Sequence, residues 1–206
     1  MAQRDDAVIV DALVRQALVS AQEVMGENGL NAVLRTSGLE RFISNFPPDD
    51  LNPAIQSTEY AKFNQAIEDF YGRGGRGMLR RIGKASFQYA VREQAALLGI
   101  AGAALKLLPE KQRIKFILNS MVNALKKSNS QVEAWIDESG DKIAYVESTC
   151  AMCHGRKSTE SICYLYVGSI SEAVTWATGQ PHNVIETHCM AKGDPHCRFE
   201  VGEVTQ

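Results

Sequence analysis

The sequence lacks an excess of charge of either sign. Its 22 lysine and arginine residues nearly balance its 24 aspartate and glutamate residues, and the formal net charge is −2. Proteins that bind nucleic acid or anionic membranes mainly through charge carry a strong basic excess. We therefore expect neither nucleic acid nor an anionic membrane surface among the partners of this chain.

The sequence also lacks a long hydrophobic run. The longest, residues 94–108, is interrupted by Lys106 and is shorter than the roughly 20 residues that a membrane-spanning helix needs. The N-terminus does not have the basic-then-apolar order of a signal peptide. We therefore expect no membrane span and a cytoplasmic location. In that reducing compartment the five cysteines are better explained as metal ligands or core thiols than as disulfides.

The hydrophobic pattern changes from a helical to a strand period near Asn129. Helical spacing predicts helices over residues 7–25, 29–44, 59–71, 78–108 and 110–127. Alternation then predicts strands over residues 131–137, 142–148, 183–190 and 197–204, with a helix over 163–178 between the two pairs. This order predicts an α+β fold, in which a helical N-terminal half packs on an antiparallel sheet of about four strands. We predict a helical extension, residues 1–55, followed by one compact unit, residues 56–206.

A glycine-rich stretch, Gly72–Gly77, matches the spelling G-x-G-x-x-G. A dinucleotide-binding fingerprint follows a strand, whereas a helix is expected before this stretch, so we reject the nucleotide interpretation. Two hypotheses remain for the stretch. It is a joint between helices, or Arg73 and Arg76 bind an anionic group of a ligand near a helix N-terminus.

The residues with the clearest chemical signal lie near the C-terminus. Glu186 and Cys189 are three positions apart, and Cys197 follows Cys189 across the turn signal Gly193-Asp194-Pro195. A strand, a tight turn and a returning strand bring the two cysteines side by side. Together with Glu186 and one upstream cysteine, they provide four ligands, which is the number that a structural zinc site needs.

Cys150 and Cys153 give a competing signal. Their C-x2-C spacing is typical of zinc sites, so this pair and the pair Cys189 and Cys197 form an alternative site of four thiolates. Cys150-Ala151-Met152-Cys153-His154 also spells the c-type haem attachment sequence. Covalent haem attachment belongs to exported proteins, so haem or another tetrapyrrole is the less favoured cofactor. In a third interpretation, both cysteines are buried thiols that line a pocket.

Several of these residues together resemble the 4-vinyl-reductase domain family. The resemblance rests on Cys163, Gly168 and Gly179, and on the Glu186-x2-Cys189-x7-Cys197 spacing with its Gly193-Asp194 turn. The resemblance is specific over about residues 130–204. Over the helical half it extends only to the order and the length of the helical segments. The family includes hydrocarbon-binding proteins, the aromatic-sensing domains of bacterial activators and a protein of bacteriochlorophyll synthesis. Its fold is shared with TRAPP subunits and is related to that of haem-based nitric-oxide sensor domains.

The resemblance implies a dimeric α+β domain that encloses an apolar ligand cavity. The aromatic-sensing members hold a zinc ion with three cysteines and one glutamate, which correspond here to Cys163, Glu186, Cys189 and Cys197. The leading hypothesis is therefore a zinc-stabilised binding domain, acting as carrier, accessory protein or sensor for an apolar small molecule. A tetrapyrrole or chlorophyll precursor is one candidate ligand.

Two other functions stay open. One is a vinyl reductase, or a reductase subunit, of chlorophyll synthesis, and the other is a structural assembly protein. The sequence shows no nicotinamide or flavin motif that would supply a hydride. A zinc ion with four protein ligands also has no open position for catalysis. The sequence therefore favours a binding protein over an enzyme.

Overall fold

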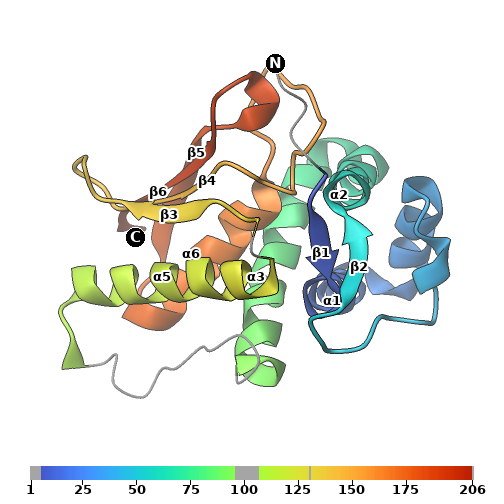
Figure 1. Ribbon diagram of the computed structural model, residues 1–206, viewed down its shortest axis with the longest axis horizontal. Coiled ribbons are helices and arrows are strands. Elements are labelled where there is room, and N and C mark those ends of the chain that lie inside the picture. The colour runs from blue at the N-terminus through green and yellow to red at the C-terminus, as the bar shows by residue number, and fades with distance from the viewer. Residues whose placement is uncertain (1–5, 96–106, 130, 206) are drawn as a thin grey trace.

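The computed structural model of the chain describes residues 6–95, 107–129 and 131–205 (Figure 1). Its helices are α1 (Asp11–Ser37), α2 (Ser57–Tyr71), α3 (Gly75–Glu93), α5 (Glu110–Ser128) and α6 (Tyr164–Thr178). A four-stranded sheet contains β3 (Ala134–Asp137), β4 (Ala144–Glu147), β5 (His182–His188) and β6 (Cys197–Val204). Two short strands, β1 (Val8–Val10) and β2 (Pro53–Gln56), form a separate pair, and short 3-10 turns lie at Glu40–Phe42, Gly72–Gly74 and Met190–Lys192.

The four-stranded sheet is antiparallel throughout and has the strand order β3-β4-β6-β5. In Figure 1, α5 and α6 lie beneath the sheet, and α1 and α2 lie to one side, beyond α3. This arrangement confirms the predicted α+β class, with a helical N-terminal half against a four-stranded antiparallel sheet. Among the described residues, no helix combines the length and the apolar character needed to cross a membrane.

The first 40 residues or so differ from the prediction in detail. Residues Val8–Val10 are not helical but pair antiparallel with β2, because β-branched side chains favour the extended chain when a partner strand is present. The helix begins at Asp11 and continues to Ser37, whereas two helices, over residues 7–25 and 29–44, were predicted. Gly26 does interrupt the helical dihedral angles, with φ 74° and ψ 165°, but the helix resumes beyond it.

Helix α3 begins at Gly75, immediately after a 3-10 turn that follows α2. The glycine-rich stretch therefore joins two helices, which confirms that no strand precedes it. The predicted helix over residues 78–108 ends at Glu93, with Gln94 as its C-cap. Most of the apolar remainder, residues 96–106, lies outside the described residues.

Helices α3 and α6 cross at very close range. A Cβ atom added at Gly83 would lie 2.0 Å from the carbonyl oxygen of Leu165, and one added at Gly168 would lie 2.1 Å from that of Arg80. Such distances leave no room for any side chain at either glycine. The crossing fixes α6 against the helical half, and it thereby positions the N-terminus of α6, where Cys163 lies.

The sheet and α6 share an aromatic core. The ring of Tyr166 on α6 packs against Tyr145 on β4 and Phe199 on β6, with centroid distances of 5.8 and 5.6 Å. Cys197 pairs with Glu147 across β4 and β6, at the end of the sheet where β6 begins. The core therefore holds the start of β6 close to the start of α6.

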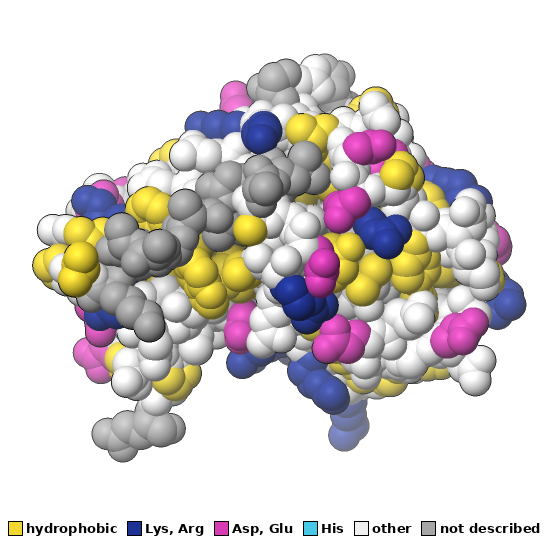
Figure 2. Space-filling model, turned by 90° about the horizontal axis from the view of Figure 1, so that it is seen from below, with side chains coloured by type: hydrophobic (Ala, Val, Ile, Leu, Met, Phe, Trp, Pro, Cys, Tyr) yellow, Lys and Arg dark blue, Asp and Glu magenta, His cyan; other side chains and the backbone are white. Residues whose placement is uncertain are grey.

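The surface below the sheet and helices carries charges of both signs. On the face shown in Figure 2, hydrophobic side chains form separate patches, and lysine, arginine, aspartate and glutamate side chains lie between them. The described residues of this face form no broad area of one sign.

Candidate metal centre and ligand cavity

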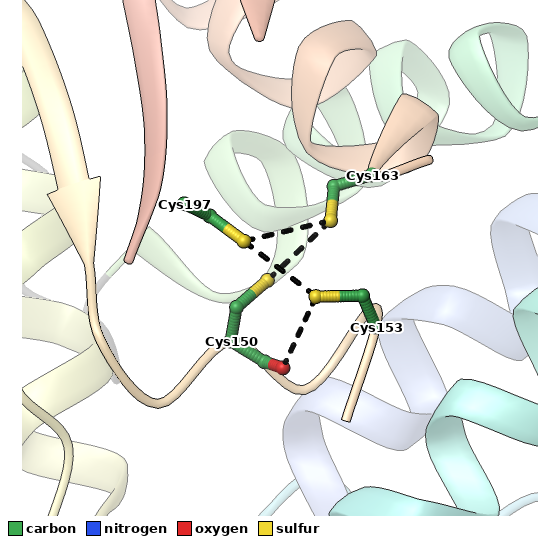
Figure 3. Close-up of side chains that lie close together, drawn as sticks. All are labelled: Cys150, Cys153, Cys163 and Cys197. Atoms are coloured by element: carbon green, nitrogen blue, oxygen red, sulfur yellow. Dashed lines mark hydrogen bonds between the residues drawn. The ribbon is translucent and has the colours of Figure 1, made fainter. Parts of the chain in front are cut away.

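Five cysteines converge at the junction of the sheet and α6. Their side chains are at most 2% exposed, and all five are free thiols. They come from the loop after β4, the N-cap of α6, the end of β5 and the first residue of β6, and they are Cys150, Cys153, Cys163, Cys189 and Cys197. Figure 3 shows the sulfur atoms of four of them, all except Cys189, directed toward one another.

The donor atoms form two overlapping sets, and within each set they lie within 4.8 Å of one another. The first set is Cys163, Glu186, Cys189 and Cys197, the four residues that the family resemblance implied. The second set is Cys150, Cys153, Cys163 and Cys197. The sequence had paired the C-x2-C cysteines with Cys189 and Cys197, whereas the structure brings them beside Cys163 and Cys197.

The distances between sulfur atoms suit tetrahedral coordination. Four ligands at the zinc–sulfur distance of about 2.3 Å would lie about 3.8 Å apart. The Sγ atom of Cys163 is 3.7 Å from that of Cys150 and 3.9 Å from those of Cys189 and Cys197. The Sγ atoms of Cys153 and Cys197 are 3.5 Å apart. The measured sulfur pairs of both sets are therefore close to the spacing of a tetrahedral zinc site.

Glu186 has one carboxylate oxygen available for a metal. Its Oε2 atom accepts a hydrogen bond of 2.8 Å from the backbone N–H of Cys163, while Oε1 is buried without a partner among the described residues. Burial raises the pKa of this carboxyl, which is 8% exposed. A cation at Oε1 would satisfy the oxygen and stabilise its charge.

The electrostatics of the thiols also favour a cation. Burial raises the pKa of Cys150 and Cys163. Hydrogen bonds from neighbouring thiols, first from Cys150 and Cys163, lower the pKa of Cys153. Without a metal ion, most thiols of the buried cluster therefore stay protonated and few are thiolates. Each further thiolate would lack a cation beside it in a medium of low dielectric constant. Metal ions are the usual compensation for such a cluster of thiolates.

The turn predicted between the last two strands supports the ligands directly. Gly193 has a positive φ of 97°, and Asp194 accepts a hydrogen bond of 2.7 Å from the backbone N–H of Cys189. The backbone N–H of Met190 donates to the Sγ atom of Cys197 at 3.4 Å. These contacts hold both cysteines in place.

A mostly apolar cavity of about 130 Å³ lies between the helical half and the sheet. Its wall includes residues of α1, α2, α3, α5, β4 and α6. Glu147 on β4 is an exception to the apolar lining, and it is 1% exposed. The hydroxyl of Tyr145 donates to Glu147 at 3.2 Å, and burial raises the pKa of Glu147 to about 7.

Two further polar atoms in the cavity wall lack partners among the described residues. They are the Oε1 atom of Gln16 and the hydroxyl of Ser86, both buried. The other end of the Gln16 amide donates to the backbone oxygen of Ser86 at 2.9 Å. The sequence did not indicate Gln16, Ser86 or Glu147. The alternation of Tyr145 and Glu147 along a strand places both on one face, but it does not reveal that this face is enclosed.

The loop after β4 contributes to both the cavity and the cysteine cluster. Thr149, Ala151 and Met152 line the cavity, while Cys150 and Cys153 belong to a donor set. One short loop is therefore a wall shared by the two sites.

The predicted ligand-binding arginines lie elsewhere. Arg76 forms an ion pair with Glu160 at the surface, and its guanidinium is 5.5 Å from the ring centre of Tyr164. Arg73 is exposed, and neither arginine lines the cavity. The described residues that line the cavity include no histidine.

Solved structures with a similar fold are H-NOX domains. An unliganded Fe(II) H-NOX protein from K. algicida has 10% identity and a TM-score of 0.58, covering 96% of this chain and 98% of that one. An H-NOX protein from S. oneidensis in the Fe(II)NO ligation state has 14% identity and a TM-score of 0.53, covering 93% and 99%. An oxygen-binding H-NOX domain related to soluble guanylate cyclases has 12% identity and a TM-score of 0.54, covering 90% and 89%. At these identities the likeness defines the fold class alone, which is that of a nitric-oxide-sensor-like α+β domain.

A family model matches the C-terminal part of the chain. Residues 144–203 match the model of the V4R domain family, which confirms the resemblance to the 4-vinyl-reductase domain family over this part of the chain. The matched residues include both donor sets and the cavity strand β4. No curated protein matches the chain.

Proposed function

We propose that this protein binds a small, largely apolar molecule of about one aromatic ring and acts as a carrier, accessory protein or sensor. A zinc ion held by Cys163, Glu186, Cys189 and Cys197 stabilises the fold beside the binding site. The observation that supports this function best is the apolar cavity between the helical half and the sheet. Five free thiols fit a reducing cytoplasm.

The size of the cavity supports a small ligand. An engineered apolar cavity of about 150 Å³ binds benzene, and the cavity here, about 130 Å³, is similar. Pockets for drug-sized ligands are larger, about 300–1,000 Å³. A haem or chlorophyll precursor would therefore require the helices and the sheet to separate, whereas a single ring would not.

The polar atoms of the wall support a ligand that carries a polar group. Glu147 accepts a hydrogen bond from Tyr145, and the buried oxygens of Gln16 and Ser86 have no partner among the described residues. A ring with one hydroxyl or amino group would supply a partner inside an otherwise apolar site. Leaving such polar atoms unpaired costs about 1–3 kcal/mol each, so a ligand with a matching group gains affinity over a purely apolar one.

The test is binding of phenol and toluene, two probes of similar size, measured by isothermal titration calorimetry. We expect saturable binding of both probes, with phenol bound more tightly. Ala124 in the cavity wall is buried, and its neighbour Asn123 is exposed. The Ala124→Leu variant should fill the cavity and lose binding, while Asn123→Leu should retain it. Absence of saturable binding by the unmodified protein would contradict the proposal.

Further measurements on the same purified protein test the alternative functions. A haem absorption band, or a tetrapyrrole released on denaturation, would show that the cavity opens to a large ligand. Turnover of a divinyl chlorophyll precursor with an added reductant would support the reductase function. The proposal includes a homodimer, which light scattering after gel filtration would detect. Binding of neither probe by a well-folded dimer would favour an assembly protein.

A further inference from the structure

We propose that the cysteine cluster holds two metal ions, bridged by the thiolates of Cys163 and Cys197. This inference rests on the metal site of the proposed function and extends it from one ion to two. It follows from which residues make up the two donor sets. The two sets lie in the same part of the molecule. They share two members and differ in the other two.

The shared members form a common edge. The Sγ atoms of Cys163 and Cys197 are 3.9 Å apart, close to the edge of about 3.8 Å expected for a zinc–thiolate tetrahedron. A thiolate sulfur has enough lone pairs to bind two ions. Two tetrahedra that share this edge therefore require no donor beyond those already assembled.

Each ion would complete its coordination with a terminal pair from one short segment. One pair is Cys150 and Cys153, from the loop after β4, and the other is Glu186 and Cys189, from the end of β5. Both pairs have two residues between their members. The terminal sulfurs lie beside the bridging ones, since Cys150 is 3.7 Å from Cys163 and Cys153 is 3.5 Å from Cys197.

Charge balance is compatible with the second ion. The first set offers four anionic donors to one dication, which leaves two negative charges. All six donors around two dications also leave two negative charges. The second ion thus adds no net charge to a site that is almost fully buried. Without it, Cys150 and Cys153 lie against the other sulfur atoms at 0% and 2% exposure with no ion to bind.

The donor types favour zinc over harder cations. Five thiols and one carboxyl form the cluster, and soft thiolate ligands select zinc, copper(I) and iron–sulfur clusters. The close sulfur–sulfur distances suit direct contact with single ions. Zinc is therefore the metal to test first.

The experiment is to load the reduced, full-length protein with excess zinc and remove unbound metal by gel filtration. Native mass spectrometry and elemental analysis then count the ions per chain, and we expect two. Loading with 113Cd should give two NMR resonances. One ion per chain would overturn the binuclear centre and leave the single zinc of the proposed function standing. No ion, or iron with acid-labile sulfide, would contradict both.

Variants show which residues bind each of the two metal ions. The double variant Cys150→Ser and Cys153→Ser should hold one ion and give one 113Cd resonance. His154→Gln should keep two, because His154 has a metal-binding side chain in the same loop but belongs to neither donor set. Two ions retained by the double variant would overturn the assignment. If the double variant fails to fold, the ion count and the two resonances of the unmodified protein still decide.

Discussion

Gly83 in α3 and Gly168 in α6 each face the backbone of the other helix, and neither position has room for a Cβ atom. The nearest atoms are backbone carbonyls of Leu165 and Arg80, which cannot rotate away as a side chain would. This crossing connects the helical half to the helix that carries Cys163 at its start. Its tolerance of substitution is therefore a direct test of the fold.

We expect Gly83→Ala to destabilise the protein by about 3 kcal/mol, because an added methyl group would force the two helices apart. The free energy of unfolding from urea denaturation measures the effect. Gly77→Ala is the matched control, since Gly77 lies in the same helix with nothing within 4 Å of an added Cβ atom. This control should be neutral or more stable by up to about 1 kcal/mol. Equal stability of both variants would contradict the close crossing.

Removal of metal should lower the melting temperature, because metal binding free energy contributes to folding. Metal that binds only the folded state stabilises it by about 4 kcal/mol when free metal is 1,000 times its dissociation constant. We expect a chelator to lower the melting temperature and added zinc to restore it. An unchanged melting temperature after complete removal of metal would exclude a structural role.

Single cysteine variants should differ in severity. Cys197→Ser removes a donor common to both sets and should yield insoluble or unfolded protein. Cys153→Ser removes a donor from one set only and should remain folded with a lower melting temperature. The soluble yield and the melting temperature of the two variants give the comparison. Normal stability of Cys197→Ser would contradict the assignment of this residue as a ligand.

At pH 8, above the raised pKa of Glu147 of about 7, Glu147→Gln should weaken binding of phenol about 10-fold and leave binding of toluene unchanged. The reason is that the loss of one hydrogen bond to a charged group is worth about 1.5 kcal/mol or more. Calorimetric titration of both probes measures the two affinities. Glu203→Gln makes the same change at an exposed position and should alter neither. Equal weakening of both probes would indicate a general change in the cavity rather than a lost polar contact.

Asp137 should make stability depend on pH in the acid range. Hydrogen bonds from Ser139, and the ion pair with Arg198, hold the pKa of this carboxyl well below its ordinary value of 3.8. The carboxylate therefore adds stability that is fully present above about pH 5 and is lost as the pH falls through the lowered pKa. The difference in melting temperature between the unmodified protein and Asp137→Asn should narrow on acidification. Asp141→Asn, at an exposed position of the next loop, is the control.

Local signals explain what could be predicted of the fold. Strand β6 was predicted with both of its bounds, because Cys197, Phe199 and Val201 alternate with more polar residues directly after the turn. The end of α6 was predicted at Gly179, which adopts the left-handed conformation with φ 78°. The pairing of β1 with β2 was not predicted. It depends on a partner more than 40 residues away, and β2 begins at a proline.

Part of the metal site was predictable, again because local sequence signals mark it. Cys189 and Cys197 lie beside a turn that the sequence marks clearly, whereas Cys163 was assigned through family resemblance alone. The neighbourhood of Cys163 and Cys150 arises from the packing of α6 against the loop after β4. Glu147 is an acid on a buried strand face, and no pattern in the sequence distinguishes it from an acid that faces solvent.

The loop from Thr149 to Cys153 alternates between lining the cavity and approaching the metal donors. If a ligand changes the affinity of the cluster for metal by shifting this loop, metal changes the affinity of the cavity for that ligand by the same factor, because coupling between two binding equilibria is reciprocal. The conformation of this loop would then depend both on whether the cavity holds a ligand and on whether the cysteine cluster holds zinc.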